Sequence, residues 1–183
     1  MTPHTFVVTV EDEPGVLNRV ASLFRRRNYN IDSLTVGRTA QPGVSRMTIV
    51  VPTDEAGAQR VAANLYKLVN VISVKDITDS PAVFRDLAMI KVAATPACRP
   101  GLVHLVDVFR ARIIDLAPDS LTIEITGAED KIDGLLEVLK PYGVLEMART
   151  GRVAMARGVK ALNGSGTATS LPDASDSNVS YSV

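Results

Sequence analysis

The first half of the chain alternates between a strand-like and a helical spacing of apolar side chains, which predicts strands and helices in turn. Residues 6–10 are apolar and β-branched, as in a strand, and residues 11–15 break that pattern. A helical stripe of apolar side chains follows, made of Val16, Leu17, Val20, Leu23 and Phe24. The later elements are a strand, a strand, a helix and a strand, at residues 31–37, 44–51, 53–68 and 69–77. The order β-α-β-β-α-β predicts a ferredoxin-like unit.

The same order of elements recurs after a polar, proline-containing linker at residues 78–81. The predicted strands and helices of this second half are residues 87–93, 100–111, 113–116, 121–126, 130–139 and 144–148. The two halves share a pattern and not residues, so only the architecture is repeated. We therefore expect an α+β fold with two ferredoxin-like βαββαβ domains, which span residues 4–78 and 83–158.

Two segments of different character follow the last predicted strand. Residues 150–158 are apolar and basic, and we expect them to dock on the second domain. From about residue 163 the chain consists mainly of Gly, Ser, Thr, Asp and Ala, which bury too little apolar surface to offset the entropy of ordering. Residues 159–183 are therefore predicted to form a disordered tail.

The two ends of the first helix carry the residue types that a small-molecule site needs. A helix N-terminus offers unpaired N–H groups and a positive dipole end, so a carboxylate docks there without a basic side chain. Gly15 leaves the approach open, and Asp12 is expected to accept hydrogen bonds at the helix start or from an ammonium group. At the other end, Asn28 suits a left-handed helix terminus and Asn30 offers both donor and acceptor atoms. The apolar floor of such a site would come from Val16, Leu17 and Ile31.

These groups suit a zwitterion with an aliphatic side chain, but the same residues also make an ordinary helix start and end. A four-stranded sheet of this type has open edges, and two copies that meet edge to edge form a longer sheet. We call residues 12–15, before the first helix, the first joint, and residues 28–30, after it, the second joint. Such pairing could bring the first joint of one chain near the second joint of its partner. The spacing alone leaves both interpretations open: a pocket shared between two subunits, or plain helix termini.

The residues around this helix carry a family resemblance. The stretch EDEPGVLNRVASLFRRRNYNIDSLTVGRT, with SRMTIVV and KLVNVISV after it, resembles the N-terminal ACT domain of acetolactate synthase (acetohydroxyacid synthase) small, regulatory subunits. In the second half, LAMIKV, FRARIIDLAPDSLTIEITG and TGRVAMARG are similar to the C-terminal domain of that family. The resemblance covers about residues 4–158. It implies an effector-binding ACT domain followed by a C-terminal small-subunit domain.

The resemblance implies a regulatory subunit in branched-chain amino-acid biosynthesis. Such a subunit activates a separate, thiamine-diphosphate-dependent catalytic subunit, which converts two pyruvates to 2-acetolactate and CO2, and it confers feedback inhibition by valine. The implied valine site at the dimer interface consists of Asp12, Glu13, Pro14, Gly15, Val16 and Leu17 of one chain and Asn30 and Ile31 of the other. Some members have Asn at the position of Asp12, so the effector preference among valine, leucine and isoleucine stays open.

The resemblance also implies the partners and cofactors. We expect a homodimer through the ACT domains and a complex with the large catalytic subunit, which would carry thiamine diphosphate, magnesium (Mg) and FAD, while this chain binds no cofactor. The second domain lacks a comparable glycine turn, so we expect it to serve dimerisation and activation. The alternative is a stand-alone ACT module that binds another amino acid and controls a different partner.

Composition argues against several other classes. Formal net charge is zero, so no global field attracts nucleic acid or an anionic membrane. An RNA-binding domain of the same strand order would stack bases on aromatic side chains, but the predicted third strand, VSRMTIVV, has none. No apolar run approaches the ~18 residues that a membrane helix needs, and no secretory signal precedes the first strand. With a single cysteine, Cys98, we expect a cytoplasmic protein.

Catalytic and metal chemistry find no support in the sequence. No GDG-type diphosphate-binding stretch is present, and joining two keto acids requires the thiamine cofactor. The two histidines are isolated: His4 is predicted to lie in a frayed terminus and His104 on a helix surface. Together with Cys98, a small residue in a predicted loop, they lack the spacing of metal ligands, so we expect no catalytic residues and no metal site.

Overall fold

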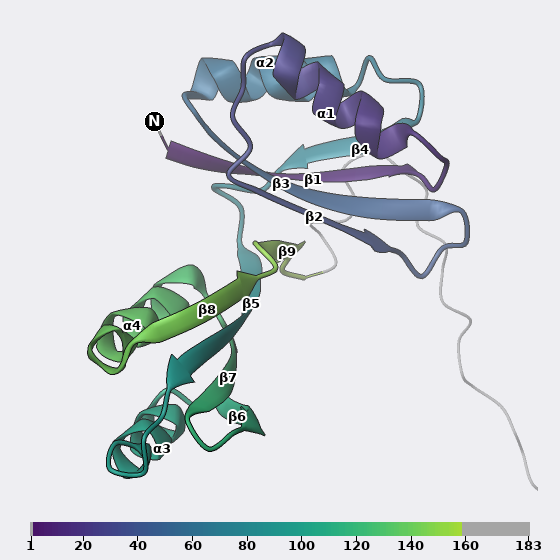
Figure 1. Ribbon diagram of the computed structural model, residues 1–183. Helices are drawn as coiled ribbons and strands as arrows, with labels where there is room; N and C mark the ends of the chain where they lie inside the picture. The colour runs from purple at the N-terminus through teal and green to yellow at the C-terminus, as the bar shows by residue number, and fades with distance from the viewer. Residues whose placement is uncertain (1, 159–183) are drawn as a thin grey trace, which may run out of the picture.

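The computed structural model describes residues 2–158, which form two antiparallel sheets, each with two helices on one face (Figure 1). The predicted tail, residues 159–183, lies outside the described residues. Both halves have the predicted β-α-β-β-α-β order, which confirms the α+β fold of two ferredoxin-like units. The exact domain boundaries stay a prediction.

The first sheet has the strand order β2-β3-β1-β4, so β2 and β4 are its edges. Its elements are β1 (Thr2–Glu11), α1 (Val16–Arg26), β2 (Ser33–Arg38), β3 (Val44–Thr53), α2 (Glu55–Leu65) and β4 (Val71–Asp76). Alternate residues of β1 and β3 point to the helices and form the core with the inner faces of α1 and α2. The buried side chains of this core include Phe6, Val8, Val20, Phe24, Ile49, Val61 and Leu65.

The second sheet has the order β6-β7-β5-β8, and one further strand, β9, pairs with β5. Its elements are β5 (Ala82–Ala93), α3 (Arg99–Val108), β6 (Arg112–Leu116), β7 (Ser120–Gly127), α4 (Glu129–Leu139), a 3-10 turn (Lys140–Tyr142), β8 (Val144–Arg149) and β9 (Val153–Ala156). Its core is filled by Ile90, Leu102, Leu121, Ile123, Ile125, Ile132 and Leu135. Leu102, Val106, Ile132 and Leu139 are buried, so both helices turn an apolar face to the sheet.

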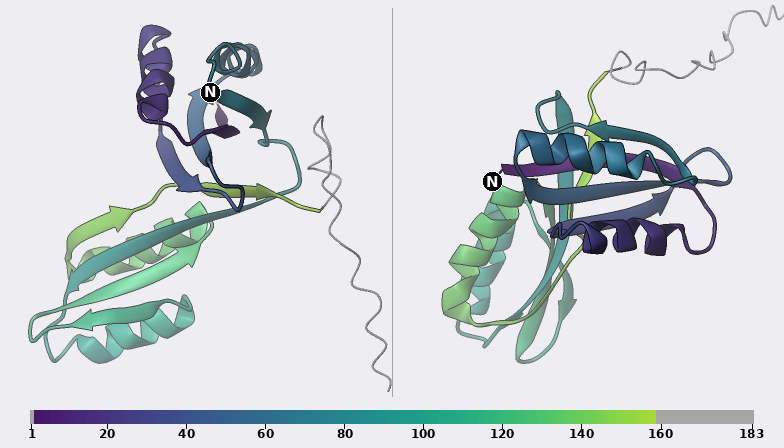
Figure 2. Two further views of the ribbon diagram at one scale, coloured as in Figure 1. Left: turned by 90° about the vertical axis from the view of Figure 1, so that its right-hand side faces the viewer. Right: turned by 90° about the horizontal axis from the view of Figure 1, so that it is seen from above.

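The two ends of the long strand β5 pair with different partners, and one of these partners, β9, also contacts the first half of the chain. Residues 86–93 pair with β7, whereas Ala82 to Arg85 pair with β9. Strand β9 lies against the face of the first sheet that the helices leave open (Figure 2), and its Ala154 is buried there with Val7 and Ile77. The predicted docking of residues 150–158 on the second domain is confirmed by this pairing, and the segment contacts the first domain as well.

The N-terminal strand is longer and better anchored than the sequence indicates. His4 is only 5% exposed, and its Nδ1 lies 2.8 Å from Asp76 Oδ2 on β4. Because β1 runs between β3 and β4, its first residues are held by partners about fifty to seventy residues away. The prediction of a frayed terminus at His4 is therefore wrong.

Asp76 makes the stability of this corner depend on pH. Burial alone would raise the pKa of the Asp76 carboxyl, but hydrogen bonds from Thr78 and from His4 outweigh it and lower that pKa. A lowered folded-state pKa means that the carboxylate stabilises the fold above the unfolded-state pKa, and that this contribution is lost as pH falls through the folded-state pKa. We expect Asp76→Asn to reduce the free energy of unfolding at neutral pH by about 1 kcal/mol, since solvent screens a partly exposed group.

The same substitution should flatten the acid limb of the stability curve, measured by urea unfolding between neutral pH and the carboxylate range. Asp79→Asn, at an exposed position three residues further on, is the matched control and should leave the curve unchanged. An acid limb that is the same in Asp76→Asn and in the parent chain would contradict this assignment.

Candidate functional site

The first helix begins without a side-chain cap, and its start is open to solvent. Gly15 adopts a left-handed conformation with φ of +86°, and a Cβ placed there would meet no atom within 4 Å. Val16 donates its N–H to Glu13 O at 3.3 Å, but no side chain in the described part of the chain caps the helix. The next N–H groups of the first turn have no acceptor within the helix. This end of α1 therefore presents N–H donors and a positive dipole to a carboxylate.

Asp12 lies beside this helix start but does not cap it, so the predicted capping role is wrong. Its Oδ1 accepts a hydrogen bond from Ser45 Oγ at 3.1 Å, and its Oδ2 lies 3.6 Å from Arg38 Nε. The pairing of β1 with β3 continues to Glu11, and this holds Asp12 against the β2–β3 hairpin instead of the helix. The carboxylate is thus fixed next to the open N–H groups, where it can accept from an ammonium group.

The apolar residues at this joint divide between the core and the surface. Val16 is buried, as predicted, but Leu17 is 45% exposed and does not belong to the inward stripe. The reason is geometric: a residue next in sequence is rotated by about 100° around the helix axis, away from the face that Val16, Val20 and Phe24 share. Leu17 instead places an apolar surface beside the free N–H groups. Glu13 and Pro14, also predicted for the site, are exposed in the same turn.

The second joint closes the other end of the helix. Asn28 has a φ of +56°, which confirms the predicted left-handed helix end. Asn30 is exposed, and its Nδ2 donates to Asp32 Oδ1 at 3.0 Å, while Ile31 is half-buried against the core. An open hollow of about 660 Å³ lies here, lined among others by Phe24, Tyr29, Asn30 and Ile31.

Within one protomer the structure does not bring the two joints together. They lie at opposite ends of α1, whose eleven residues span about 16 Å at the usual helical rise. They also flank opposite ends of the edge strand β2, because Asn30 and Ile31 precede Ser33 while Asp12 approaches Arg38. One chain therefore supplies two separate halves of the predicted site.

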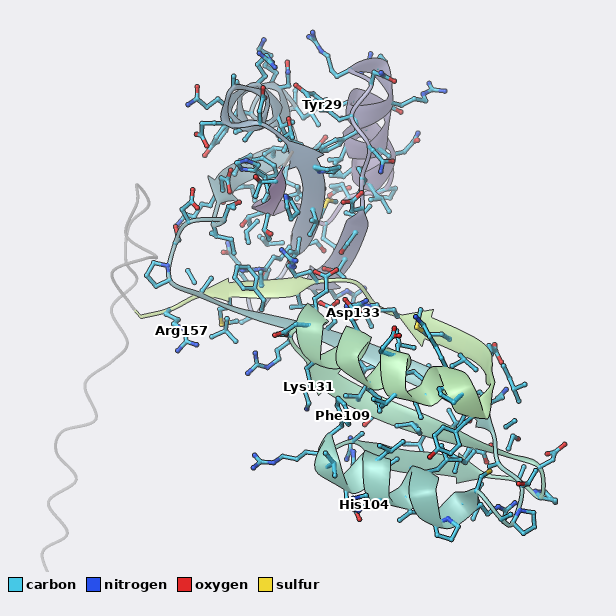
Figure 3. All side chains as sticks on the ribbon, turned by 90° about the vertical axis from the view of Figure 1, so that its left-hand side faces the viewer. Tyr29, His104, Phe109, Lys131, Asp133 and Arg157 are labelled. Atoms are coloured by element: carbon cyan, nitrogen blue, oxygen red, sulfur yellow. The ribbon has the colours of Figure 1, made fainter. Side chains whose placement is uncertain are left out.

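The remaining chemical candidates do not assemble into a centre. His104 is exposed on α3, as predicted (Figure 3), and Cys98 is half-buried at the start of the same helix. Among residues 2–158, no three His, Cys, Asp or Glu side chains lie close enough to hold a metal ion. No helix within the same range is long and apolar enough to cross a membrane.

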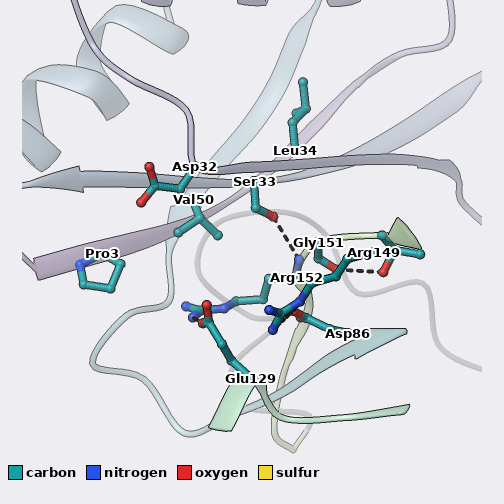
Figure 4. Close-up of a pocket in the computed structure, with 11 residues that line it drawn as sticks. Pro3, Asp32, Ser33, Leu34, Val50, Asp86, Glu129, Arg149, Gly151 and Arg152 are labelled. Carbon is teal, nitrogen blue, oxygen red and sulfur yellow. Dashed lines mark hydrogen bonds and ion pairs between the residues drawn. The ribbon is translucent and has the colours of Figure 1, made fainter. Parts of the chain in front are cut away.

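A polar cavity between the two sheets was not predicted. It has a volume of about 440 Å³ and is lined by Asp32 and Ser33 from the first half of the chain and by Asp86, Arg149 and Arg152 from the second (Figure 4). Burial alone would lower the pKa of Arg149, but the carboxylates of Asp86 and Asp133 outweigh it and raise that pKa. Arg149 Nη2 is 2.9 Å from Asp86 Oδ2 yet is not aligned for a hydrogen bond, so this contact is an ion pair. Only the basic character of residues 150–158 hinted at this arrangement.

Comparison with known proteins assigns both halves of the chain. Residues 6–73 match the model of the AHAS small subunit-like ACT domain, and residues 85–158 match the model of the small subunit of acetolactate synthase. A probable acetolactate synthase small subunit of Archaeoglobus fulgidus is 51% identical over 157 residues, which are 86% of this chain and 98% of that protein. The chain belongs to the acetolactate synthase small-subunit family.

Other members of the family agree in sequence and in structure. The acetolactate synthase small subunit of Mycolicibacterium smegmatis is 46% identical over 159 residues, 87% of this chain and 94% of that protein. The crystal structure of the small subunit from Thermotoga maritima superposes with a TM-score of 0.80 at 38% identity, and the match covers 86% of this chain and 99% of that one. The resemblance identified from the sequence is thereby confirmed, together with the two-domain fold of the small subunits.

Proposed function

We propose that this small subunit activates a separate acetolactate synthase catalytic subunit and senses a branched-chain amino acid, valine first, between two copies of its ACT domain. The observation that carries the proposal is the open start of α1. Gly15 leaves the first-turn N–H groups accessible, Asp12 supplies a carboxylate beside them, and Leu17 adds an exposed apolar surface. These three features complement the carboxylate, ammonium and side chain of an aliphatic amino acid.

Pairing of two β2 edges would complete the pocket. In a two-fold antiparallel pair, the start of one strand lies beside the end of the other. The start of β2 follows Asn30 and Ile31, and its end at Arg38 lies next to Asp12. The second joint of one chain would then face the Gly15 turn of its partner. Pairing through the other edge, β4, would not do this, because β4 is separated from β2 by two strands.

Membership of the family supports the following division of labour with the catalytic subunit. The catalytic subunit would carry thiamine diphosphate, magnesium and FAD, and it would perform the chemistry on pyruvate. This chain would bind only the amino-acid effector. We assign activation and additional dimer contacts to the second domain, whose edge strand β6 is exposed throughout and whose edge strand β8 is exposed up to Arg149.

Reconstitution tests the proposal directly. Mixing the full chain with its cognate catalytic subunit should raise acetolactate production severalfold, and millimolar valine should reverse most of that gain. Leucine and isoleucine, added singly, define the effector preference, and alanine is the control for a zwitterion with too small a side chain. A chain that binds an amino acid in calorimetry but neither copurifies with the catalytic subunit nor changes its rate would instead be the stand-alone ACT module.

A further inference from the structure

One residue, Arg152, connects the effector edge of the first domain to the second domain. Both main-chain groups of Arg152 form hydrogen bonds with side chains of β2. The N–H donates to Ser33 Oγ at 2.9 Å, and the carbonyl accepts from Thr35 Oγ1 at 3.1 Å. Ser33 and Thr35 alternate along β2, so both hydroxyls lie on the sheet face opposite the helices. Figure 4 shows the contact with Ser33 among the residues that line the cavity.

The side chain of Arg152 extends the connection in both directions. Nη1 donates to the buried Thr5 Oγ1 of β1 at 2.9 Å, and Nη2 contacts Glu129 Oε2 at 2.6 Å. The guanidinium carbon also lies 5.3 Å from the centre of the Phe84 ring, which belongs to β5. Glu129 is the first residue of α4, so the chain of contacts ends on a helix that covers the second sheet. Only 19% of the Arg152 side chain is exposed, but Glu129 is 54% exposed, so solvent screens their ion pair in part.

The close approach at this point leaves little freedom for independent motion. Gly151 has a φ of +83°, and a Cβ there would lie 2.5 Å from Ser33 Oγ. Three residues further on, Arg46 Nη2 donates to the carbonyl of Ala154 at 2.5 Å, so a second side chain of the first sheet holds β9. A shift of β2 must therefore move residues 151–154, and with them the partner of Glu129.

We infer that Arg152 is a positioning residue that transmits effector occupancy from β2 to α4. The inference rests on the proposed effector site, because Asn30 and Ile31 lie directly before Ser33 in the chain. An effector that favours one position of β2 shifts the position of α4 only through contacts that differ between the two states. We assign this role to the contacts of Arg152 with Ser33, Thr35 and Glu129. None of these residues touches the Gly15 turn.

The test separates binding from response. Arg152→Gln removes the ion pair with Glu129 and leaves the main-chain contacts with β2 in place. Glu129→Gln breaks the same ion pair from the other side, and Thr35→Val removes the hydroxyl that holds the Arg152 carbonyl. The control is Lys91→Gln, which breaks an exposed ion pair with Glu146 within the second sheet and leaves the joint between the domains intact.

Each of the variants at Arg152, Glu129 and Thr35 should bind valine with an affinity within about twofold of the parent chain in calorimetry. Inhibition of the reconstituted enzyme should nevertheless weaken by about fivefold or more. Because Arg152 and Glu129 act as one unit, their double variant should lose no more inhibition than either single variant. A merely structural role would lower activation and inhibition in parallel, with a lower melting temperature, and that result would overturn the inference. The inference would also be overturned if the variants at Arg152, Glu129 and Thr35 behaved like Lys91→Gln. Absence of valine binding by the parent chain would instead refute the proposed function.

Discussion

Gly15→Asp should abolish inhibition by valine while activation of the catalytic subunit is retained. The new carboxylate would lie at the open N-terminus of α1, where the effector carboxylate is proposed to dock, and it would interact with the same N–H groups. The substitution should be tolerated by the fold, because a Cβ at Gly15 meets no atom within 4 Å and Asp is among the residues that accept a left-handed conformation. We expect valine affinity to fall by at least about a hundredfold, since a docked charge is lost and a like charge replaces it.

Gly15→Asn is the matched control for this variant. It imposes the same backbone strain and nearly the same volume without the charge, so it should retain a measurable part of the valine response. Calorimetry on the free subunit and inhibition assays on the reconstituted enzyme provide the two measurements. An unchanged valine response in Gly15→Asp would place the effector elsewhere.

The sequence predicts this fold well where the pattern is local. The helix α1 could be placed because its apolar stripe, its glycine turn and its left-handed Asn28 are all encoded within fifteen residues. The sequence pattern predicts the start of β5 at residue 87 instead of Ala82, because residues 82–85 pair only with β9, some seventy residues away. His4 was misjudged for the same reason: its partner Asp76 is far away in sequence.

The candidate site could be predicted only in part, and again distance along the chain decides which part. Glycine, carboxylate and amide residues at the two helix ends have a local chemical meaning, which made both joints recognisable. The roles of Asp12 and Leu17 depend on neighbours from the β2–β3 hairpin and on rotation about the helix axis, so they needed the structure. Arg152 contacts residues from four elements, β1, β2, β5 and α4, and no spacing in the sequence brings these together.

Val36→Pro should separate the two subunits of the proposed dimer and abolish the proposed valine binding without unfolding the protomer. Thr39 donates its N–H to Val44 O on the β3 side, and along an antiparallel strand every second residue bonds to the same neighbour. Val36 lies three residues before Thr39, so its N–H points away from β3 to the free edge of the sheet. Proline there removes a donor that β3 does not use, which edge strands tolerate. In a two-fold pair centred on Val36, however, that donor is lost twice.

Two unmade hydrogen bonds at a buried edge should cost about 3 kcal/mol, which is roughly a hundredfold in the dimer dissociation constant. Val36→Ala retains the N–H and controls for loss of the side chain, which is 47% exposed in the protomer. Sedimentation velocity measures the subunit equilibrium, circular dichroism measures the fold, and calorimetry measures valine binding. If each proposed pocket uses the Gly15 turn of one chain and Asn30 of the other, dissociation and loss of binding should follow the same concentration dependence. A monomeric Val36→Pro chain that still binds valine with the parent affinity would show that one protomer holds the complete site.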